Sequence, residues 1–334
     1  MIRYLNEFEK MNISPLYEET FQDDYDYCQF FYNTVIPQAD IIADIDSLKK
    51  IQSMITLIPK EINVGRTRCD CYYLYGVATE KKLRGQGKMS VLLKTLMENL
   101  YNEEQAFTYL IPDSDLNRNY YRKFGFETVM DKYENKQKEK IKRPSHSFMQ
   151  RKAENSDAVR LSIFAQNSLS KKYGIFVVHS KEYFMRLIEL MKTEKGYVEI
   201  ILKDKLILGY RVIVDGKIIE EITDDKIKQF EMTGYKSKPY AMARVINAKK
   251  MIGMVNTNDA GSVVLKLNDD IIADNNGVFI WNYKPGKMTW EKTDKDPDVE
   301  MSIGEFSQYS LGYRHFDGLP ALNTMAGFYI NDYI

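Results

Sequence analysis

The chain has 334 residues, a length that favours two or three domains over one. Its 47 basic and 47 acidic side chains cancel, so no overall charge attracts nucleic acid or an anionic membrane, and we expect neither as a partner. No run of about eighteen apolar residues is present, and the N-terminus MIRYLNEFEK has no apolar signal core, which together predict a cytoplasmic protein.

The cysteines and histidines argue against a metal site. The cysteines, Cys28, Cys69 and Cys71, are odd in number, and the last two alternate onto one face of a predicted strand, where thiols usually pack. A metal site is the alternative, but the chain has only three histidines to support it. We therefore expect no metal.

The N-terminal segment predicts a strand followed by an aromatic and acidic helical region. Ile2–Leu5 forms the strand, and Ser14 caps a helix that has Pro15 in its first turn. Aromatic residues then recur at near-helical spacing among acids: Tyr17, Phe21, Tyr25, Phe30 and Phe31. Two interpretations stay open, an apolar core with a solvated acidic face or an aromatic-lined acidic cleft that attracts a cationic amine. Strands at Ile41–Ile45 and Met54–Ile58 follow.

Residues 72–100 carry the strongest signal, a strand, a glycine loop and a helix in direct succession. Tyr72–Ala78 is apolar and aromatic, and apolar residues recur at helical spacing from Val91 to Leu100. The loop Arg84-Gly85-Gln86-Gly87 therefore opens the helix. A helix N-terminus has unpaired N–H groups and a partial positive charge, and glycines let a ligand approach the backbone. The segment predicts a phosphate site, although it matches neither the nucleotide-triphosphatase nor the dinucleotide pattern.

The next residues continue this alternation, with a strand at Ala106–Ile111, a helix at Asp115–Lys123 and an exit through Phe124-Gly125-Phe126 into a further strand. The succession resembles the core of the GNAT N-acetyltransferases. Their pyrophosphate loop reads RxxGxG or RxxGxA; Arg84 and Gly87 match it, and the bulky Met89 resembles the Eis-like branch. The segment YRKFGF is similar to the FYxxFGF that closes the GNAT core.

The resemblance implies that acetyl-CoA is the co-substrate and that the motif strand and the loop bind it. The binding residues implied are Val77, Ala78, Thr79, Arg84, Gly85, Gln86, Gly87, Lys88 and Met89. Many GNAT members also hold the pantetheine with an asparagine where this chain has Ser114, and Asn117, one turn before Tyr121, can substitute for it. In this family the N-terminal helices wall the acceptor pocket.

Downstream of the core, Asp131–His146 has five lysines and almost no large hydrophobe, which predicts a linker, a basic nucleic-acid patch being the alternative. Two helices and three strands follow, and their order mimics the first half of a GNAT core without its glycine loop. They lie at Ala158–Ser170, Lys181–Lys192, Tyr197–Leu202, Leu206–Val214 and Lys217–Thr223. We interpret this region as a degenerate GNAT-like copy.

The C-terminal part predicts a short strand at Ala243–Ile246, a helix at Ala248–Val255 and a meander of strands that includes Ile271–Ala273. Ser302 and Glu305 form a capping box that starts a last helix. This part resembles the sterol-carrier-protein-like domain of the Eis family. The predicted class is therefore α+β, with a GNAT mixed sheet and flanking helices (1–135), a second GNAT-like domain (136–238) and a sterol-carrier-like α/β sandwich (239–334).

N-acetyl transfer needs a group that holds the thioester, one that takes a proton from the amine and one that gives a proton to sulfur. The proton donor of the family matches Tyr121, four residues before Gly125. In Eis-like enzymes the terminal carboxylate serves as the base, which here is that of Ile334, and the apolar ending GFYINDYI fits a docked tail. A hydrophobic tail that merely closes the third domain is the alternative. No Ser-His-Asp or Cys-His arrangement is visible, which favours direct transfer without an acyl-enzyme.

The resulting hypothesis is an Eis-like N-acetyltransferase that acts on a small-molecule or peptide amine. Known members of that family assemble as hexamers, so the resemblance implies a homo-oligomer. The competing hypothesis is a non-catalytic protein that binds or senses acyl-CoA or an apolar ligand. The presence of Arg84, Gly87 and Tyr121 favours the enzyme, because a pure binding protein has no need of the tyrosine.

Overall fold

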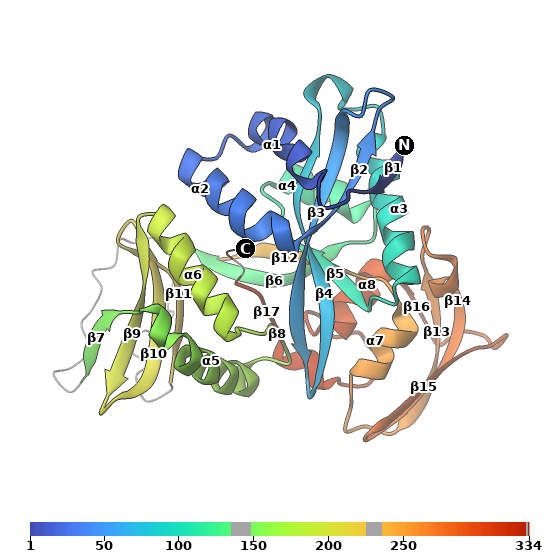
Figure 1. Ribbon diagram of the computed structural model, residues 1–334. Coiled ribbons are helices and arrows are strands. Elements are labelled where there is room, and N and C mark those ends of the chain that lie inside the picture. The colour runs from blue at the N-terminus through green and yellow to red at the C-terminus, as the bar shows by residue number, and fades with distance from the viewer. Residues whose placement is uncertain (135–147, 225–235, 332, 334) are drawn as a thin grey trace.

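A mixed nine-stranded sheet runs through the centre of the molecule (Figure 1). The computed structural model describes residues 1–134, 148–224, 236–331 and 333. Seven strands cross the sheet in the order β1 (Ile2–Tyr4), β2 (Asp40–Ile45), β3 (Ile51–Val64), β4 (Thr67–Thr79), β5 (Phe107–Leu110), β12 (Lys236–Val245) and β6 (Glu127–Glu134). In addition, β8 (Ile175–Val177) pairs with the C-terminal end of β3, and β17 (Phe328–Tyr329) pairs with β8. The sheet thus joins segments from the beginning, middle and end of the chain.

Alternate side chains of β3 and β4 face opposite sides of this sheet, as the two-residue period of a strand requires. On one side Ile55, Leu57 and Leu74 pack with α3 (Lys88–Asn102) and with α4 (Asp115–Arg122). On the other side Met54, Ile58 and Tyr73 belong to the cluster that holds α1 (Ser14–Phe21) and α2 (Tyr25–Phe30), followed by a π-helical turn at Phe31–Val35.

A second sheet has four antiparallel strands in the order β11 (Lys217–Thr223), β10 (Leu206–Val214), β9 (Gly196–Lys203) and β7 (Met149–Lys152). Helices α5 (Ala158–Lys172) and α6 (Lys181–Thr193) cover it. The two helices and the strands β9 to β11 lie where the sequence predicts them. Whether this part is a degenerate GNAT-like copy stays a prediction.

The third sheet has the order β15 (Lys287–Lys292), β14 (Gly277–Lys284), β13 (Gly261–Asn268) and β16 (Val299–Ser302), with β16 parallel to β13. It lies beside α7 (Ala248–Met254) and α8 (Ile303–Ser310). The capping box of α8 is confirmed, because the Ser302 hydroxyl accepts from the Glu305 N–H while the Glu305 carboxylate accepts from the Ser302 N–H. The α+β class with a central mixed sheet and flanking helices is confirmed as well.

Strand β12 ties the first and third parts together. It pairs antiparallel with β5 on one side and with β6 on the other, so it lies in the sheet between two strands that precede it by more than a hundred residues. It is therefore longer than the predicted strand at Ala243–Ile246, and it crosses the predicted boundary at 238/239. The boundary at 135/136 lies outside the described residues.

Three local predictions were wrong for identifiable reasons. Ile271–Ala273 is no strand, because the Asp269 carboxylate accepts from the N–H groups of Ile271 and Ile272 and turns the chain into a 3₁₀ turn. Ser14 is no cap, because a 3₁₀ helix at Lys10–Ile13 leads directly into α1. The predicted linker begins too early, since Asp131–Glu134 belong to β6; its residues 135–146 lie outside the described residues.

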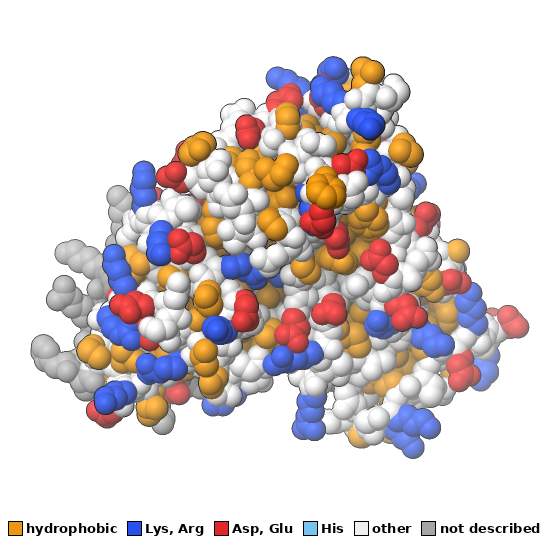
Figure 2. All heavy atoms as spheres, viewed as in Figure 1, with side chains coloured by type: hydrophobic (Ala, Val, Ile, Leu, Met, Phe, Trp, Pro, Cys, Tyr) orange, Lys and Arg blue, Asp and Glu red, His pale blue; other side chains and the backbone are white. Residues whose placement is uncertain are grey.

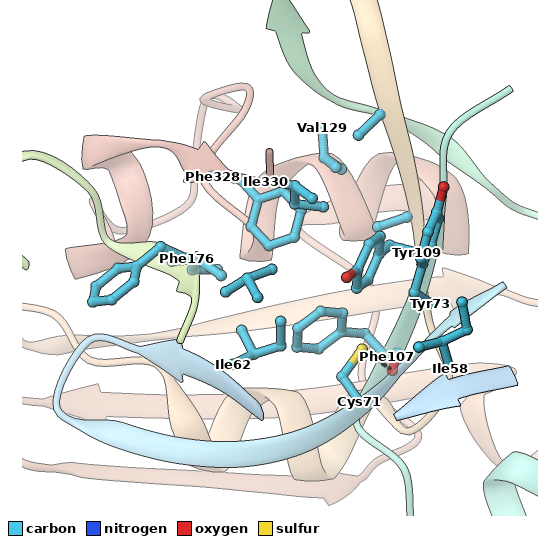
Figure 3. Close-up of a cluster of buried hydrophobic side chains, with 14 of the residues drawn as sticks. Ile58, Ile62, Cys71, Tyr73, Phe107, Tyr109, Val129, Phe176, Phe328 and Ile330 are labelled. Carbon is cyan, nitrogen blue, oxygen red and sulfur yellow. Dashed lines mark hydrogen bonds between the residues drawn. The ribbon is translucent and has the colours of Figure 1, made fainter. Parts of the chain in front are cut away.

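The largest apolar core lies on the α1–α2 side of the sheet, and the chain end contributes to it. Figure 3 shows Phe328 and Ile330 beside Tyr109 and Val129, with Cys71 and Phe107 on the sheet. Cys71 is 2% exposed, and its thiol donates to the Phe107 carbonyl at 3.2 Å. On the face shown in Figure 2, acidic and basic side chains are interspersed. In the described part of the chain, no helix has the length and apolar character needed to span a bilayer.

Candidate active site

The glycine loop lies at the start of α3, as predicted. Gly85 and Gly87 have φ of 78° and 79°, a left-handed conformation that suits glycine. A Cβ at either position would meet no atom within 4 Å, so the backbone there is open to solvent. No side chain caps α3 and its first turn holds no acid, which leaves the first N–H groups, those of Lys88, Met89 and Ser90, available to an anion.

The two cationic side chains of the loop differ in their contacts: one is exposed and the other is paired with a carboxylate. Arg84 is exposed; its Nε donates to the Thr79 carbonyl at 3.0 Å, and its terminal nitrogens donate to no other described residue. Lys88 instead donates to Asp44 at 2.8 Å. Burial opposes ionisation of Asp44, but hydrogen bonds from Lys88 and the N-terminal amine lower its pKa. The loop therefore offers an anion one free guanidinium and a set of backbone N–H groups.

The motif strand β4 separates from its neighbour just before the loop. It pairs in parallel with β5 only at Tyr72 and Tyr73 among the described residues, and from Leu74 to Thr79 its edge toward β5 is unpaired. On the other edge, the register places Ile55 opposite both Gly76 and Val77, a β-bulge, with Gly76 at a φ of 58°. Because β5 no longer pairs with this strand end, backbone N–H groups on that edge can donate to a ligand in the gap, and the bulge on the other edge changes which residues present them.

Tyr121 lies in the last turns of α4, against the same apolar cluster that holds Val77 and Met89. Its side chain is 8% exposed and packs on Phe126 and Tyr120. Burial, with a smaller effect of Asp113, raises the pKa of Tyr121 well above its usual value. The phenol makes no hydrogen bond with a described residue, whereas the Tyr120 hydroxyl lies 3.2 Å from that of Ser90. The fold therefore brings Tyr121 to the side of the sheet on which the glycine loop lies.

The two polar residues that precede Tyr121 have local roles. Ser114 caps α4 by accepting from the Asn117 N–H at 3.2 Å, and the Asn117 amide donates to Asp113 at 2.7 Å. The carbonyl of the Asn117 side chain stays free of such bonds among the described residues. Its assignment to the pantetheine thus remains a prediction.

A cluster of tyrosine hydroxyls lies on the opposite face, above the bulge. The Tyr17 hydroxyl donates to Asp23 at 2.8 Å and lies 3.2 Å from that of Tyr75, which is 2.8 Å from that of Tyr27. Burial raises the pKa of all three phenols. The sequence pattern indicated Tyr17 and the acids but missed Tyr27 and Tyr75. Their hydroxyls meet only because a helix folds over a strand, a contact that no local spacing reports.

Ile334, the predicted source of the base, lies outside the described residues. The chain is described up to Asn331 and again at Tyr333. Phe328 and Ile330 are 4% and 0% exposed, so this described part of the chain ending is docked in the core.

Two family models match the sequence. Residues 1–129 match the acetyltransferase (GNAT) domain, and residues 245–329 match the sterol carrier protein domain. A search of curated protein sequences found no match.

Solved structures resemble nearly the whole chain. A probable N-acyltransferase from Enterococcus faecalis is 15% identical, with a TM-score of 0.78 over 94% of this chain and 90% of that one. A GCN5-related N-acetyltransferase from Anabaena variabilis is 14% identical, with a TM-score of 0.72 over 93% and 90%. Eis1 from Mycobacterium abscessus is 9% identical, with a TM-score of 0.69 over 93% and 89%. At these identities the similarity establishes a common fold.

Proposed function

We propose that the chain is an acyltransferase that transfers an acetyl group from acetyl-CoA to a primary amine. The matches of its N-terminal part to the acetyltransferase (GNAT) domain and of its C-terminal part to the sterol carrier protein domain support this proposal. The observation that carries the proposal is the uncapped start of α3, where two left-handed glycines and the exposed Arg84 adjoin the gap between β4 and β5. The CoA pyrophosphate matches the charge of that helix start, and the gap suits the extended pantetheine.

In this reaction the strand end holds the thioester. Val77, Ala78 and Thr79 run beside the pantetheine, and an N–H of the bulged strand donates to the carbonyl oxygen as it becomes an oxyanion. The amine nitrogen attacks the carbonyl carbon, forms the new C–N bond and expels the CoA thiolate when the tetrahedral intermediate collapses. Because no enzyme nucleophile is needed, the transfer is direct.

Tyr121 gives the proton to the leaving sulfur. Burial raises the pKa of Tyr121, so the phenol is protonated at neutral pH. A thiol has a lower ordinary pKa, about 8.5, so the transfer depends on the phenol lying beside the sulfur as the C–S bond breaks, and the phenolate regains a proton from solvent. The lack of a hydrogen-bond partner among the described residues leaves the hydroxyl free to reach the sulfur.

In this proposal the terminal carboxylate of Ile334 takes the proton that the amine nitrogen loses as it forms the new C–N bond. The docking of Phe328 and Ile330 into the core supports it, because an anchored ending holds the last residues near one place. The acceptor side is the face that carries the hydroxyls of Tyr17, Tyr27 and Tyr75 with Asp23, groups that suit a polar, cationic amine.

An acetyl-CoA assay against polyamines, aminoglycosides, peptides and arylamines tests the proposal. We expect release of CoA with at least one of these amines and tight binding of CoA by calorimetry. CoA binding without transfer to any acceptor would favour an acyl-CoA sensor instead. The absence of both would refute the proposed function.

A further inference from the structure

A buried carboxyl group, Glu220 of β11, lies where the chain end meets the second sheet. Its side chain is 4% exposed. The hydroxyls of Tyr210 and Tyr329 both donate to its Oε1, at 3.0 and 2.8 Å. The second oxygen, Oε2, is buried and accepts no hydrogen bond of normal geometry from a described residue. The mechanism above uses none of these groups.

The residues that follow Tyr329 are also held by hydrogen bonds from other elements. The Tyr183 hydroxyl of α6 donates to the Asn331 carbonyl at 3.1 Å, and Lys132 of β6 donates to the Asn331 side-chain oxygen at 3.4 Å. The Asn331 amide in turn donates to the Tyr333 hydroxyl at 2.7 Å. Apolar packing of Phe328 and Ile330 can hold a tail in more than one register, but directional bonds to successive residues select a single one.

The charged and titratable groups around Glu220 lie on several different elements of the fold. Among the described residues, the cation that faces it is Lys132, and the phenols are those of Tyr210, Tyr329 and Tyr333. Beyond them, His179 Nδ1 lies 3.1 Å from the Tyr210 hydroxyl. Burial raises the pKa of Glu220 to about 7, while the hydroxyls of Tyr329 and Tyr210, then Lys132 and Asn331, act in the opposite direction.

We propose that Glu220 is a positioning residue: through Tyr329 it seats the end of the chain on the acetyltransferase sheet and so fixes where the terminal carboxylate lies. The inference rests on the proposed function, in which that carboxylate takes a proton from the amine. Glu220 itself touches neither substrate nor acetyl-CoA. Its effect is to hold Tyr329 in one position, from which the hydrogen bonds to Asn331 continue.

Seating of the tail is coupled to protonation of Glu220. When the tail leaves, water reaches the carboxyl group and its pKa returns toward the ordinary value of 4.5. The seated state therefore binds the proton more tightly than the open state does. It follows that seating weakens as the pH rises from about 4.5 through about 7 and changes little above that range.

Hydrogen exchange of the C-terminal peptide, measured by mass spectrometry on the full-length protein, reports seating without reference to activity. Tyr329→Phe keeps the ring that stacks on Tyr173 and removes one donor to Glu220. We expect exchange about tenfold faster and kcat about tenfold lower, with CoA affinity unchanged. Glu220→Gln keeps an acceptor for both hydroxyls and removes the charge. We expect a seated tail whose exchange, corrected for the intrinsic rate, no longer depends on pH between 5 and 8.

Tyr72→Phe is the matched control, because it removes a tyrosine–carboxylate hydrogen bond to Asp40 of 2.9 Å, and Tyr72 packs on the α3 side of the sheet while the tail packs on the other side. It should leave tail exchange unchanged. Wild-type exchange in Tyr329→Phe, or the wild-type pH dependence in Glu220→Gln, would overturn the proposal. Lack of acetyl transfer by the wild-type protein would instead refute the proposed function, and the exchange measurement would still decide whether Glu220 seats the tail.

Discussion

The glycine loop and the seat of the chain end are built in opposite ways. The loop uses contiguous residues, Arg84 to Met89, whose backbone conformations follow from two glycines and the start of a helix. The seat gathers side chains from β6, α6, β10, β11 and β17, which meet only when the whole chain has folded. We therefore expect changes in the loop to affect one binding step, and changes at the chain end to affect catalysis without affecting CoA binding.

The largest expected effect comes from lengthening the chain end. Two glycines added after Ile334 move the terminal carboxylate by up to about 7 Å, while the apolar side chains stay docked. We expect turnover to fall by more than about 10²-fold, because a misplaced proton acceptor loses most of its effect, with CoA affinity unchanged by calorimetry. Ile334→Val, which keeps the carboxylate at its place in the chain, is the control. Full activity of the lengthened protein would direct the search for the base to the acids of residues 18–26.

Tyr121→Phe tests the proposed transfer of a proton from this tyrosine to the leaving sulfur. The change keeps the ring in its apolar cluster and removes the proton donor, so turnover should fall by about 10²-fold while CoA affinity stays near that of the wild type. Tyr120→Phe is the matched control, since it removes the hydroxyl of the neighbouring tyrosine, which contacts Ser90. Equal turnover of Tyr121→Phe and wild type, with chemistry shown to limit the rate, would leave Tyr121 a packing residue.

Gly87→Asp tests the loop alone. It places a carboxylate and a Cβ beside the N–H groups proposed to bind the pyrophosphate, and we expect CoA affinity to fall at least about tenfold by calorimetry. Gly216→Asp is a close control, because Gly216 has a φ of 72° and no atom within 4 Å of an added Cβ. Both variants carry the same backbone strain, so only a difference between them reports on the ligand. Equal affinities would remove the loop from the CoA site.

The smallest expected effect concerns a purely local prediction. Ser302→Ala removes the hydroxyl of the α8 capping box and should lower the free energy of unfolding by about 1 kcal/mol in urea denaturation. Ser14→Ala should have a smaller effect, because Ser14 lies inside its helix and caps nothing. Equal losses from the two serines would contradict the assignment of the caps.

The same contrast explains how far the sequence could predict the structure. Where a residue acts only on its neighbours in the chain, the sequence was sufficient to predict the structure. This holds for the glycine loop, for the Ser302–Glu305 capping box and for most helices and strands. Ser14 and Ile271–Ala273 failed because adjacent segments, a preceding 3₁₀ helix and the Asp269 carboxylate, took the same backbone groups. Tyr75, Glu220 and the full length of β12 depend on contacts between residues far apart in the chain. Their roles could not be predicted from spacing, because each needs a partner that only the fold supplies.

The insertion of β12 between β5 and β6 sets an order of events during synthesis. The ribosome completes β6 at residue 134, but the strand that fills the gap begins at residue 236. At about 5–20 residues per second, the nascent chain waits roughly 5–20 s with two facing strand edges unsatisfied. Exposed edges recruit other strands, so a fragment that ends before residue 236 should aggregate although it contains the whole glycine loop. The segment that carries the acyltransferase motif is continuous in sequence, but we expect that it cannot fold without β12.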